Sequence, residues 1–158
     1  MKPPRSEFFQ AYLLEPRSPQ NQLAAELLID ELESALLAEV EKQQNSYKGA
    51  KAIAHTLENL VLRHTNPSGW QAYLKHEITR KSGQTQSLLE DVLNWLQYRP
   101  GLPVAAALDK AAEVLQGQYN RHGKICPLKP DELNKIKQKL YPAALRAFLA
   151  QMMGRLTE

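Results

Sequence analysis

The sequence predicts an all-α protein, a compact bundle of about six to seven helices joined by short loops. No stretch of four to eight residues alternates β-branched or aromatic with polar side chains, and the chain has no Asn-Gly or Asp-Gly hairpin turn. Apolar residues instead recur at spacings of three and four, as on the buried face of a helix. The length of 158 residues fits one helical domain over residues 1–158.

The chain opens with a proline-bounded N-terminal arm, residues 1–17, which holds a short predicted helix from Glu7 to Leu14. Pro16 ends that helix, because proline cannot continue the hydrogen-bond ladder. The first long helix is expected from Ser18 to about Gln44, with Ser18 as its cap and Pro19 in its first turn. We assign Leu23, Leu27, Ile29, Leu32, Leu36, Leu37 and Val40 to its core face, and Glu26, Asp30, Glu33 and Glu41 to its solvent face.

The same spacing predicts the remaining helices. They are expected from Tyr47 to about His64, from Trp70 to about Lys81, from about Thr85 to Gln97 and from Val104 to about Tyr119. Turn-forming residues 65–69 and 120–130 mark loops, and residues 99–103, with two prolines and a glycine, are the main interruption between two helical halves. After Pro130 we expect two helices, because Tyr141-Pro142 starts a new one.

The sequence lacks the patterns that catalysis or cofactor binding requires. The four histidines, His55, His64, His76 and His122, include no pair at the four-residue spacing of metal ligands on a helix. His122 and Cys126 are four apart but have no second pair nearby, so we interpret them as loop residues. No Gly-x-Ser-x-Gly motif and no phosphate-binding glycine loop occur. We therefore expect a noncatalytic protein without metal or cofactor.

Composition points to the cytoplasm rather than to a membrane or the cell exterior. The single cysteine, Cys126, cannot form an internal disulfide. No run of about 18 apolar residues occurs, and the N-terminus lacks the apolar core of a signal peptide. We expect a soluble, cytoplasmic protein that makes no membrane contact.

Charge is segregated along the chain, which predicts a nucleic-acid-binding surface. Residues 1–44 carry a net charge of −4, residues 45–99 carry +3 and residues 100–158 carry +4. Long cationic side chains on a rigid bundle bind phosphates without reading sequence, although a solvated face is the plain alternative. The candidate binding residues are Lys48, Lys51, Lys75, Arg80, Lys81, Arg121, Lys124, Lys129, Lys135, Lys137 and Lys139. Lys135, Lys137 and Lys139 are expected on solvent faces.

Five aromatic residues divide into two predicted groups. Tyr98 and Tyr119 adjoin basic residues and are candidates for stacking on the bases of a single strand. Trp70, Tyr73 and Trp95 are assigned to the core.

Three segments resemble the small helical subunits of CRISPR effector complexes, of the Cascade-like and type III kinds. They are the run from Tyr47 to Lys51 with Leu57 and Val61, the run from Asn66 to Leu74, and the run from Leu89 to Leu96. The closing run from Leu140 to Leu149 is similar to the final helix of that family. The resemblance implies a noncatalytic subunit, present in several copies, that stacks along a filament bound to guide RNA. It also implies that basic side chains support the target or displaced strand.

Two function hypotheses follow. The first is an accessory subunit of a nucleoprotein complex, with guide RNA or a target or displaced strand, other effector subunits and copies of itself as partners. The second is a helical protein–protein adaptor without nucleic-acid binding, motivated by the acidic helix and by Phe8, Phe9 and Tyr12, which could dock in a partner's groove. Salt-sensitive binding of oligonucleotides distinguishes the two.

Overall fold

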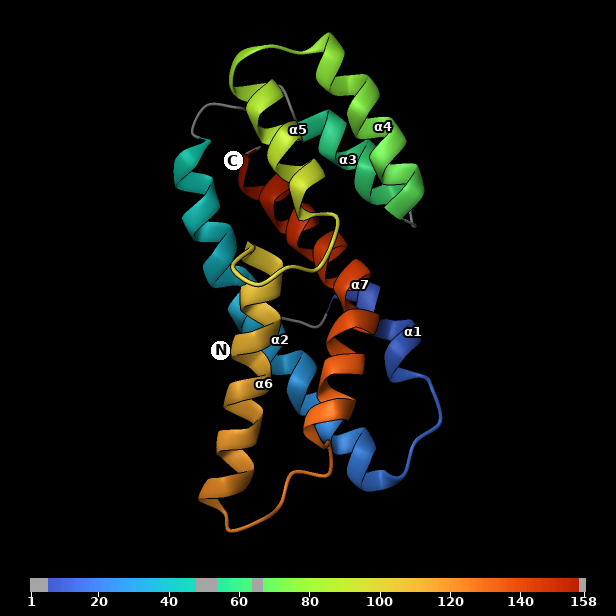
Figure 1. Cartoon of the computed structure of the whole chain (residues 1–158), viewed down its shortest axis with the longest axis vertical. Helices are drawn as coiled ribbons and strands as arrows, with labels where there is room; N and C mark the ends of the chain where they lie inside the picture. Colours follow the sequence, from blue (N-terminus) through green and yellow to red (C-terminus); the bar gives the residue numbers. More distant parts are fainter. Residues whose placement is uncertain (1–5, 48–53, 64–66, 157–158) are drawn as a thin grey trace.

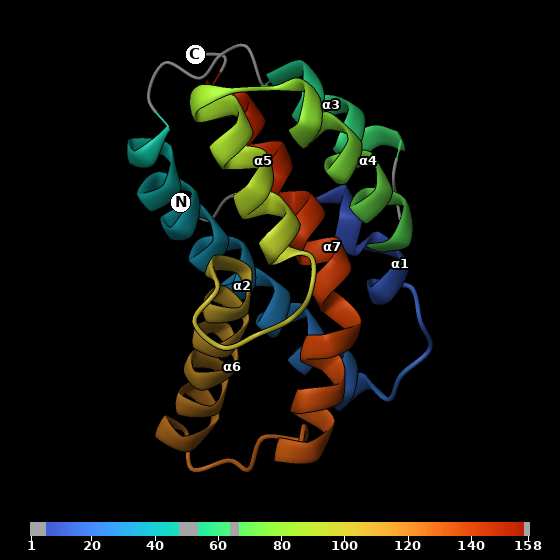
Figure 2. The ribbon, with the colours of Figure 1, turned by 45° about the horizontal axis from the view of Figure 1, so that its top comes forward.

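A computed structural model describes residues 6–47, 54–63 and 67–156. Within these ranges the chain forms a 3₁₀ turn, η1, and seven α-helices without a strand, so the all-α prediction is confirmed. Three long helices, α2 (Pro19–Ser46), α6 (Pro103–Arg121) and α7 (Pro130–Leu156), make the body of the bundle (Figure 1). The shorter α3, α4 and α5 gather at one end, beside the C-terminal half of α7 (Figures 1 and 2).

The N-terminal segment folds back onto the bundle. The short predicted helix is confirmed as η1 (Glu7–Phe9) and α1 (Gln10–Leu13), with the Ser6 Oγ accepting a hydrogen bond from the Phe8 N–H at 3.3 Å. Phe9 is fully buried and Tyr12 is buried beside it, while η1 packs against α7. These side chains belong to the protein's own core, so Phe9 and Tyr12 are not free to dock in a partner's groove, as one hypothesis required.

Helix α2 begins as predicted, with the Ser18 Oγ accepting from the Asn21 N–H at 3.3 Å. Ile29, Leu32, Leu36 and Val40 form its fully buried stripe. The burial predicted from the spacing is wrong for Leu23 and Glu33. Leu23 is 52% exposed, because it lies at a groove near the end of α6 rather than beneath a neighbouring helix. Glu33 is only 2% exposed, because the N-terminal segment covers it and the Ser6 N–H donates to its Oε1 at 2.6 Å.

Helices α3 (Ala54–Arg63), α4 (Pro67–Arg80) and α5 (Gly83–Trp95) form the smaller end of the bundle. The Trp70 Nε1–H donates to the Leu60 carbonyl at 3.1 Å and ties α4 to α3. The predicted turn at residues 65–69 is wrong at its C-terminal end, since Pro67 begins α4, a position where its missing N–H costs nothing. Gly83, at a φ of 64°, makes the reversal between α4 and α5.

Helix α6 packs along α2 through small side chains. Ala105, Ala107, Ala111 and Ala112 are all buried, so the two backbones approach closely. The helix starts at Pro103 and ends at Arg121, two residues beyond the predicted end. It follows the proline-rich interruption, and α7 then returns alongside it.

Helix α7 runs unbroken from Pro130 to Leu156, so the prediction of a new helix at Tyr141-Pro142 is wrong. Proline removes one backbone N–H, which leaves the carbonyl of Gln138 without its helical partner. Gln138 lies on the exposed side of the helix, where water can hydrate that carbonyl. Leu140, Tyr141 and Leu145 are buried on the other side, so core packing holds the two halves in line.

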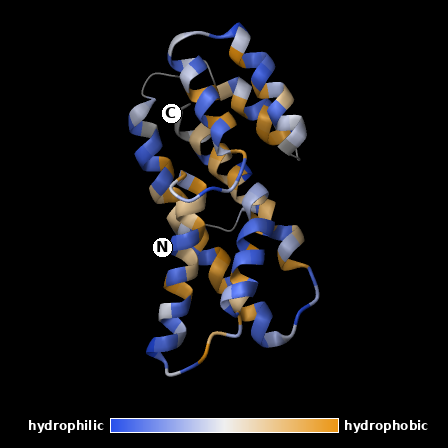
Figure 3. Cartoon of the chain, viewed as in Figure 1, coloured by the Kyte–Doolittle hydropathy of each residue, from blue (hydrophilic) through white to orange (hydrophobic). Residues whose placement is uncertain are grey.

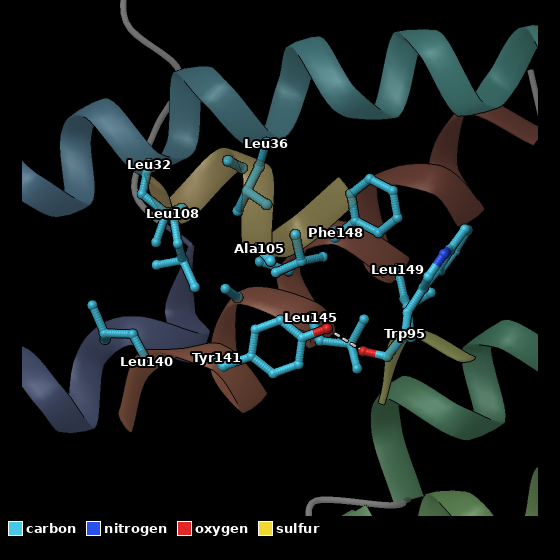
Figure 4. Packing of buried hydrophobic residues seen from close by; sticks show 14 of the residues in the cluster. Leu32, Leu36, Trp95, Ala105, Leu108, Leu140, Tyr141, Leu145, Phe148 and Leu149 are labelled. Carbon is cyan, nitrogen blue, oxygen red and sulfur yellow. Dashed lines mark hydrogen bonds between the residues drawn. The ribbon is translucent and has the colours of Figure 1, made fainter. Parts of the chain in front are cut away.

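The core is one continuous cluster shared by the three long helices. Figure 4 shows Leu32 and Leu36 of α2 facing Leu145 and Phe148 of α7. The Trp95 ring meets the Phe148 ring edge to face, with 5.5 Å between centroids. The buried Tyr141 hydroxyl donates to the Trp95 carbonyl and fixes the end of α5 on α7 (Figure 4).

Candidate nucleic-acid interface

The predicted cations that the structure describes fall into two places on the molecule. Lys75, Arg80 and Lys81 belong to α4 or follow it, far from the rest. The others lie on the C-terminal end of α6, the connection 122–129 and the first half of α7: Arg121, Lys124, Lys129, Lys135, Lys137 and Lys139. Figures 1 and 2 place α4 and the α6–α7 connection at opposite ends of the bundle. Lys48 and Lys51 lie outside the described residues.

The cations of α4 do not form a common site. Lys75 is exposed on a groove of about 510 Å³ that Arg99 and Glu90 also line. Arg80 lies 3.6 Å from the Glu77 carboxylate, one turn earlier on the same helix. Lys81 is exposed just after the helix ends. The carboxylates beside Lys75 and Arg80 weaken any attraction of this region for phosphates.

Lys137 is not on a solvent face, contrary to the prediction. Its side chain is only 18% exposed, and its Nζ lies 3.2 Å from the Asp109 Oδ1 of α6. The same oxygen accepts a hydrogen bond from the Tyr98 hydroxyl at 2.6 Å. Burial and this bond to Asp109 raise the pKa of Tyr98 to about 12. Lys137 therefore closes a polar cluster that joins α6, α7 and the residues after α5.

Lys139 is exposed but also engaged. Its Nζ lies 2.7 Å from the Glu15 Oε2 and 5.6 Å from the centroid of the Tyr12 ring. The Arg17 guanidinium stands 3.9 Å from the same ring. The hydrogen bond from Lys139 lowers the pKa of Glu15. We call Lys137 and Lys139 the junction lysines, because each ties α7 to another segment of the chain.

Four cations remain together at one end of the bundle, and we call them the basic end: Arg121, Lys124, Lys129 and Lys135. All four residues are exposed. None of the four has an ion pair with another part of the chain that the structure describes. Figure 3 shows hydrophilic residues at the end of α6, followed by a hydrophobic stretch of the connection.

A tight turn after α6 places Lys124 beside the end of the helix. The Tyr119 carbonyl accepts from the His122 N–H at 3.2 Å and from the Lys124 N–H at 3.0 Å. Gly123 adopts a φ of 65°, the left-handed conformation that glycine takes without steric cost and that commonly ends helices. The turn directs the chain from α6 into the connection within three residues.

A groove of about 500 Å³ lies beside the basic end, between the start of α2 and the end of α6. Its lining consists of Leu23, Leu27, Gln118, Tyr119, Arg121, His122 and Lys124. The two leucines are one helical turn apart on α2, and Tyr119 is half-buried on α6. Next to Lys124, Ile125 is 93% exposed. The groove thus combines apolar walls with cations.

The predicted aromatic residues have different roles. Tyr98 is held by Asp109 and packs edge to face on Tyr141 at 5.6 Å, so its ring is not available for stacking on a base. Tyr119 lines the groove, and burial raises the pKa of its hydroxyl. Trp70 and Trp95 are buried in the core as predicted, and Tyr73 packs partly buried against it.

The buried acid of α2 has a structural role. Burial raises the pKa of Glu33, whose carboxylate accepts the Ser6 N–H and thereby holds the N-terminal segment. Within the described ranges, no three His, Cys, Asp or Glu side chains gather closely enough to hold a metal ion. Nor does any helix of those ranges combine the length and apolar character of a membrane span.

Sequence reasoning missed the apolar half of the site. Leu23 and Leu27 fit the spacing of core residues, and Gln118 carries no signal of its own. The groove exists because the end of α6 leaves Leu23 uncovered, which is a property of tertiary packing. The sequence also gives no sign that Asp109, 28 residues before Lys137, is the partner of that lysine.

Comparison with protein-family models, with curated proteins and with solved structures finds no match to this chain.

Proposed function

We propose that this protein is a noncatalytic helical accessory subunit of a nucleoprotein complex and holds a nucleic-acid strand by its phosphate backbone. The observation that carries the proposal is the basic end, where Arg121, Lys124, Lys129 and Lys135 are exposed and have no ion pair within the described chain. Cations without acidic partners bind phosphates by releasing the counterions that surround nucleic acid.

The scaffold suits a holding function. The C-terminal turn of α6 and the first turns of α7 are anchored through the continuous core, so Arg121 and Lys135 are presented on rigid helices and Lys124 and Lys129 on the short connection between them. Phosphate contacts of this kind position a strand without reading its bases. Phosphate contacts are therefore sufficient for a protein that supports a strand regardless of its sequence.

The resemblance to small subunits of CRISPR effectors supplies the proposed assembly. In an RNA-guided effector, the basic end would contact guide RNA or the target or displaced strand. Other effector subunits and further copies of this chain would be its protein partners. The half-exposed acidic residues of α2, Glu26 and Glu31 among them, offer a surface of opposite charge for such a neighbour.

The salt dependence of binding tests the proposal. Four phosphate contacts on a single strand predict a slope of about −3 for log affinity against log salt, which weakens binding about 50-fold between about 50 and 200 mM. Fluorescence anisotropy of a labelled single-stranded RNA and DNA measures it. Absence of binding at both salt concentrations would contradict the proposal.

A matched pair of variants locates the contact. Neutralising the basic end with R121Q, K124Q, K129Q and K135Q together should bring the slope close to zero. The control neutralises four exposed cations elsewhere, R63Q, K75Q, K81Q and K110Q, and changes the net charge equally. This control variant should keep most of the wild-type slope of log affinity against log salt. Equal losses in both variants would mean that overall charge, rather than the basic end, governs binding.

A further inference from the structure

The groove beside the basic end has a chemistry that backbone binding alone does not use. Leu23, 52% exposed, and Leu27 form one apolar wall, and Tyr119 forms part of the other. Apolar side chains left open to water in a concave site, with a few charged groups at its rim, are typical of ligand sites of this volume. The strand proposed above would pass directly beside this space.

Charge distinguishes this groove from three other grooves on the described part of the chain. Arg121, His122 and Lys124 stand among its lining residues, which include no carboxylate. Each of those three grooves includes at least one carboxylate, from Glu15, Glu90 or Asp109 among others. The lining residue Gln118 donates its Nε2–H to the Glu31 Oε1 at 3.0 Å, so that neighbouring carboxylate is already engaged. The cations at the rim therefore make the groove complementary to an apolar group that carries a negative charge.

We infer that the groove takes one unstacked base of a bound single strand, between Tyr119 and the leucines of α2. This inference rests on the proposed function. A nucleotide joins a flat, largely apolar ring to a phosphate, which matches apolar walls beside Arg121 and Lys124. The Tyr119 ring supplies the aromatic surface on which bases stack without regard to sequence. Bases inside a duplex are already stacked and paired, so only a single strand can fill the groove.

Binding to an abasic strand separates base capture from backbone binding. The probes are a labelled single strand of about 12 nucleotides, the same strand with every base removed, and the duplex of equal length. All carry the phosphates that the basic end contacts. The intact single strand should bind about tenfold or more tightly than the abasic strand, because stacking one base on an aromatic side chain typically supplies that much affinity.

Variants of the groove test whether its walls cause the difference in affinity between the intact and the abasic strand. L23Q and Y119A should each lower the affinity of the intact strand toward that of the abasic strand, and Y119F should keep it, because the ring remains. The control L62Q alters another exposed leucine, on α3, and should change nothing. Circular dichroism verifies that each variant is folded.

The two failures are distinguishable. If intact and abasic strands bind equally and with steep salt dependence, and the groove variants bind like the wild type, base capture is wrong while backbone binding stands. The groove would then serve another occupant, such as an acidic segment of a partner protein. If no strand binds at about 50 mM salt, the proposed function itself fails, and base capture fails with it.

Discussion

The junction lysines and the lysines of the basic end all lie between Lys124 and Lys139 in the sequence and differ in what faces them. Lys137 lies beside Asp109 and Lys139 beside Glu15, so the charges of both lysines are paired with carboxylates of the same chain. Lys129 and Lys135 form no ion pair with the described chain, and Lys135 shares a groove with Glu15 and Glu132 without contacting either as an ion pair. Equal charge in the sequence therefore gives two different surfaces, one that fastens helices and one that can bind an external anion.

A run of lysines in a sequence therefore predicts a phosphate-binding site only for those lysines that have no carboxylate partner in the fold. A paired surface lysine contributes little attraction for phosphate, because the negative charge of its partner largely cancels its electric field at distances beyond a few ångströms. Only the unpaired members of the run should release counterions on binding nucleic acid.

The largest effect on stability is expected from truncating a core side chain beneath both regions. Phe148 is fully buried under Trp95, on the helix that carries Lys135 and both junction lysines. F148A should lower the free energy of unfolding by about 3–5 kcal/mol, through lost burial and the cavity left behind. Urea denaturation measures it. I125A, at a residue 93% exposed, is the control and should change it by less than about 0.5 kcal/mol.

The second prediction concerns a variant that removes the partner of Lys137 and leaves the basic end unchanged. D109A removes the acceptor of the Tyr98 hydroxyl and the partner of Lys137. Because the Asp109 side chain is 44% exposed, we expect a modest loss of stability, about 1–2 kcal/mol. Affinity for a single strand should not fall. E113A, at an exposed acid of the same helix, should leave stability unchanged, and a loss equal to that of D109A would refute a specific junction.

The third prediction concerns the pH dependence of the same cluster. The folded protein raises the pKa of Tyr98 to about 12 from the ordinary value of 10.0. Between these values the folded chain binds more protons than the unfolded chain, so the contribution of Tyr98 to stability falls as pH rises through this window. The phenolate absorbance of the wild type minus that of Y98F should show a midpoint near pH 12. In the D109A background the midpoint should be lower, and an unchanged midpoint would contradict the assigned hydrogen bond.

The smallest effect belongs to the exposed pair. Lys139 lowers the pKa of Glu15, so this pair stabilises the fold above the ordinary pKa of Glu15, and the stabilisation is lost as pH falls through the lowered value. K139Q should raise the pKa of Glu15, measured by NMR titration of its carboxyl carbon. K135Q serves as the control and should leave that pKa where it is. The same pKa in wild type and K139Q would show that the pair does not persist in solution.

Most of the fold could be predicted from the sequence because helix signals are local. Ser18-Pro19 sets the start of α2, and the spacing of Ile29, Leu32 and Leu36 identifies its buried face. The errors arose where distant segments meet. Glu33 is buried because Ser6 returns to it from 27 residues away, and Pro142 stays inside a helix because core packing on both sides outweighs the lost hydrogen bond.

The candidate site was predictable only in part. Charge counting found Arg121, Lys124, Lys129 and Lys135, since surface cations are visible in any sequence. It could not separate them from Lys137 and Lys139, because the partners Asp109 and Glu15 are far away in the chain. The groove depends on where α6 ends relative to Leu23, and no local pattern encodes that geometry.

The most direct test compares two double variants that remove the same charge from the same stretch of chain. K129Q with K135Q should reduce the steepness of the salt dependence of single-strand binding by about 1.4, the value for two phosphate contacts. K137Q with K139Q should leave that slope nearly unchanged and lower stability instead. Fluorescence anisotropy across a salt series measures both. Equal reductions in slope by the two variants would contradict the division of these lysines into fastening and binding residues.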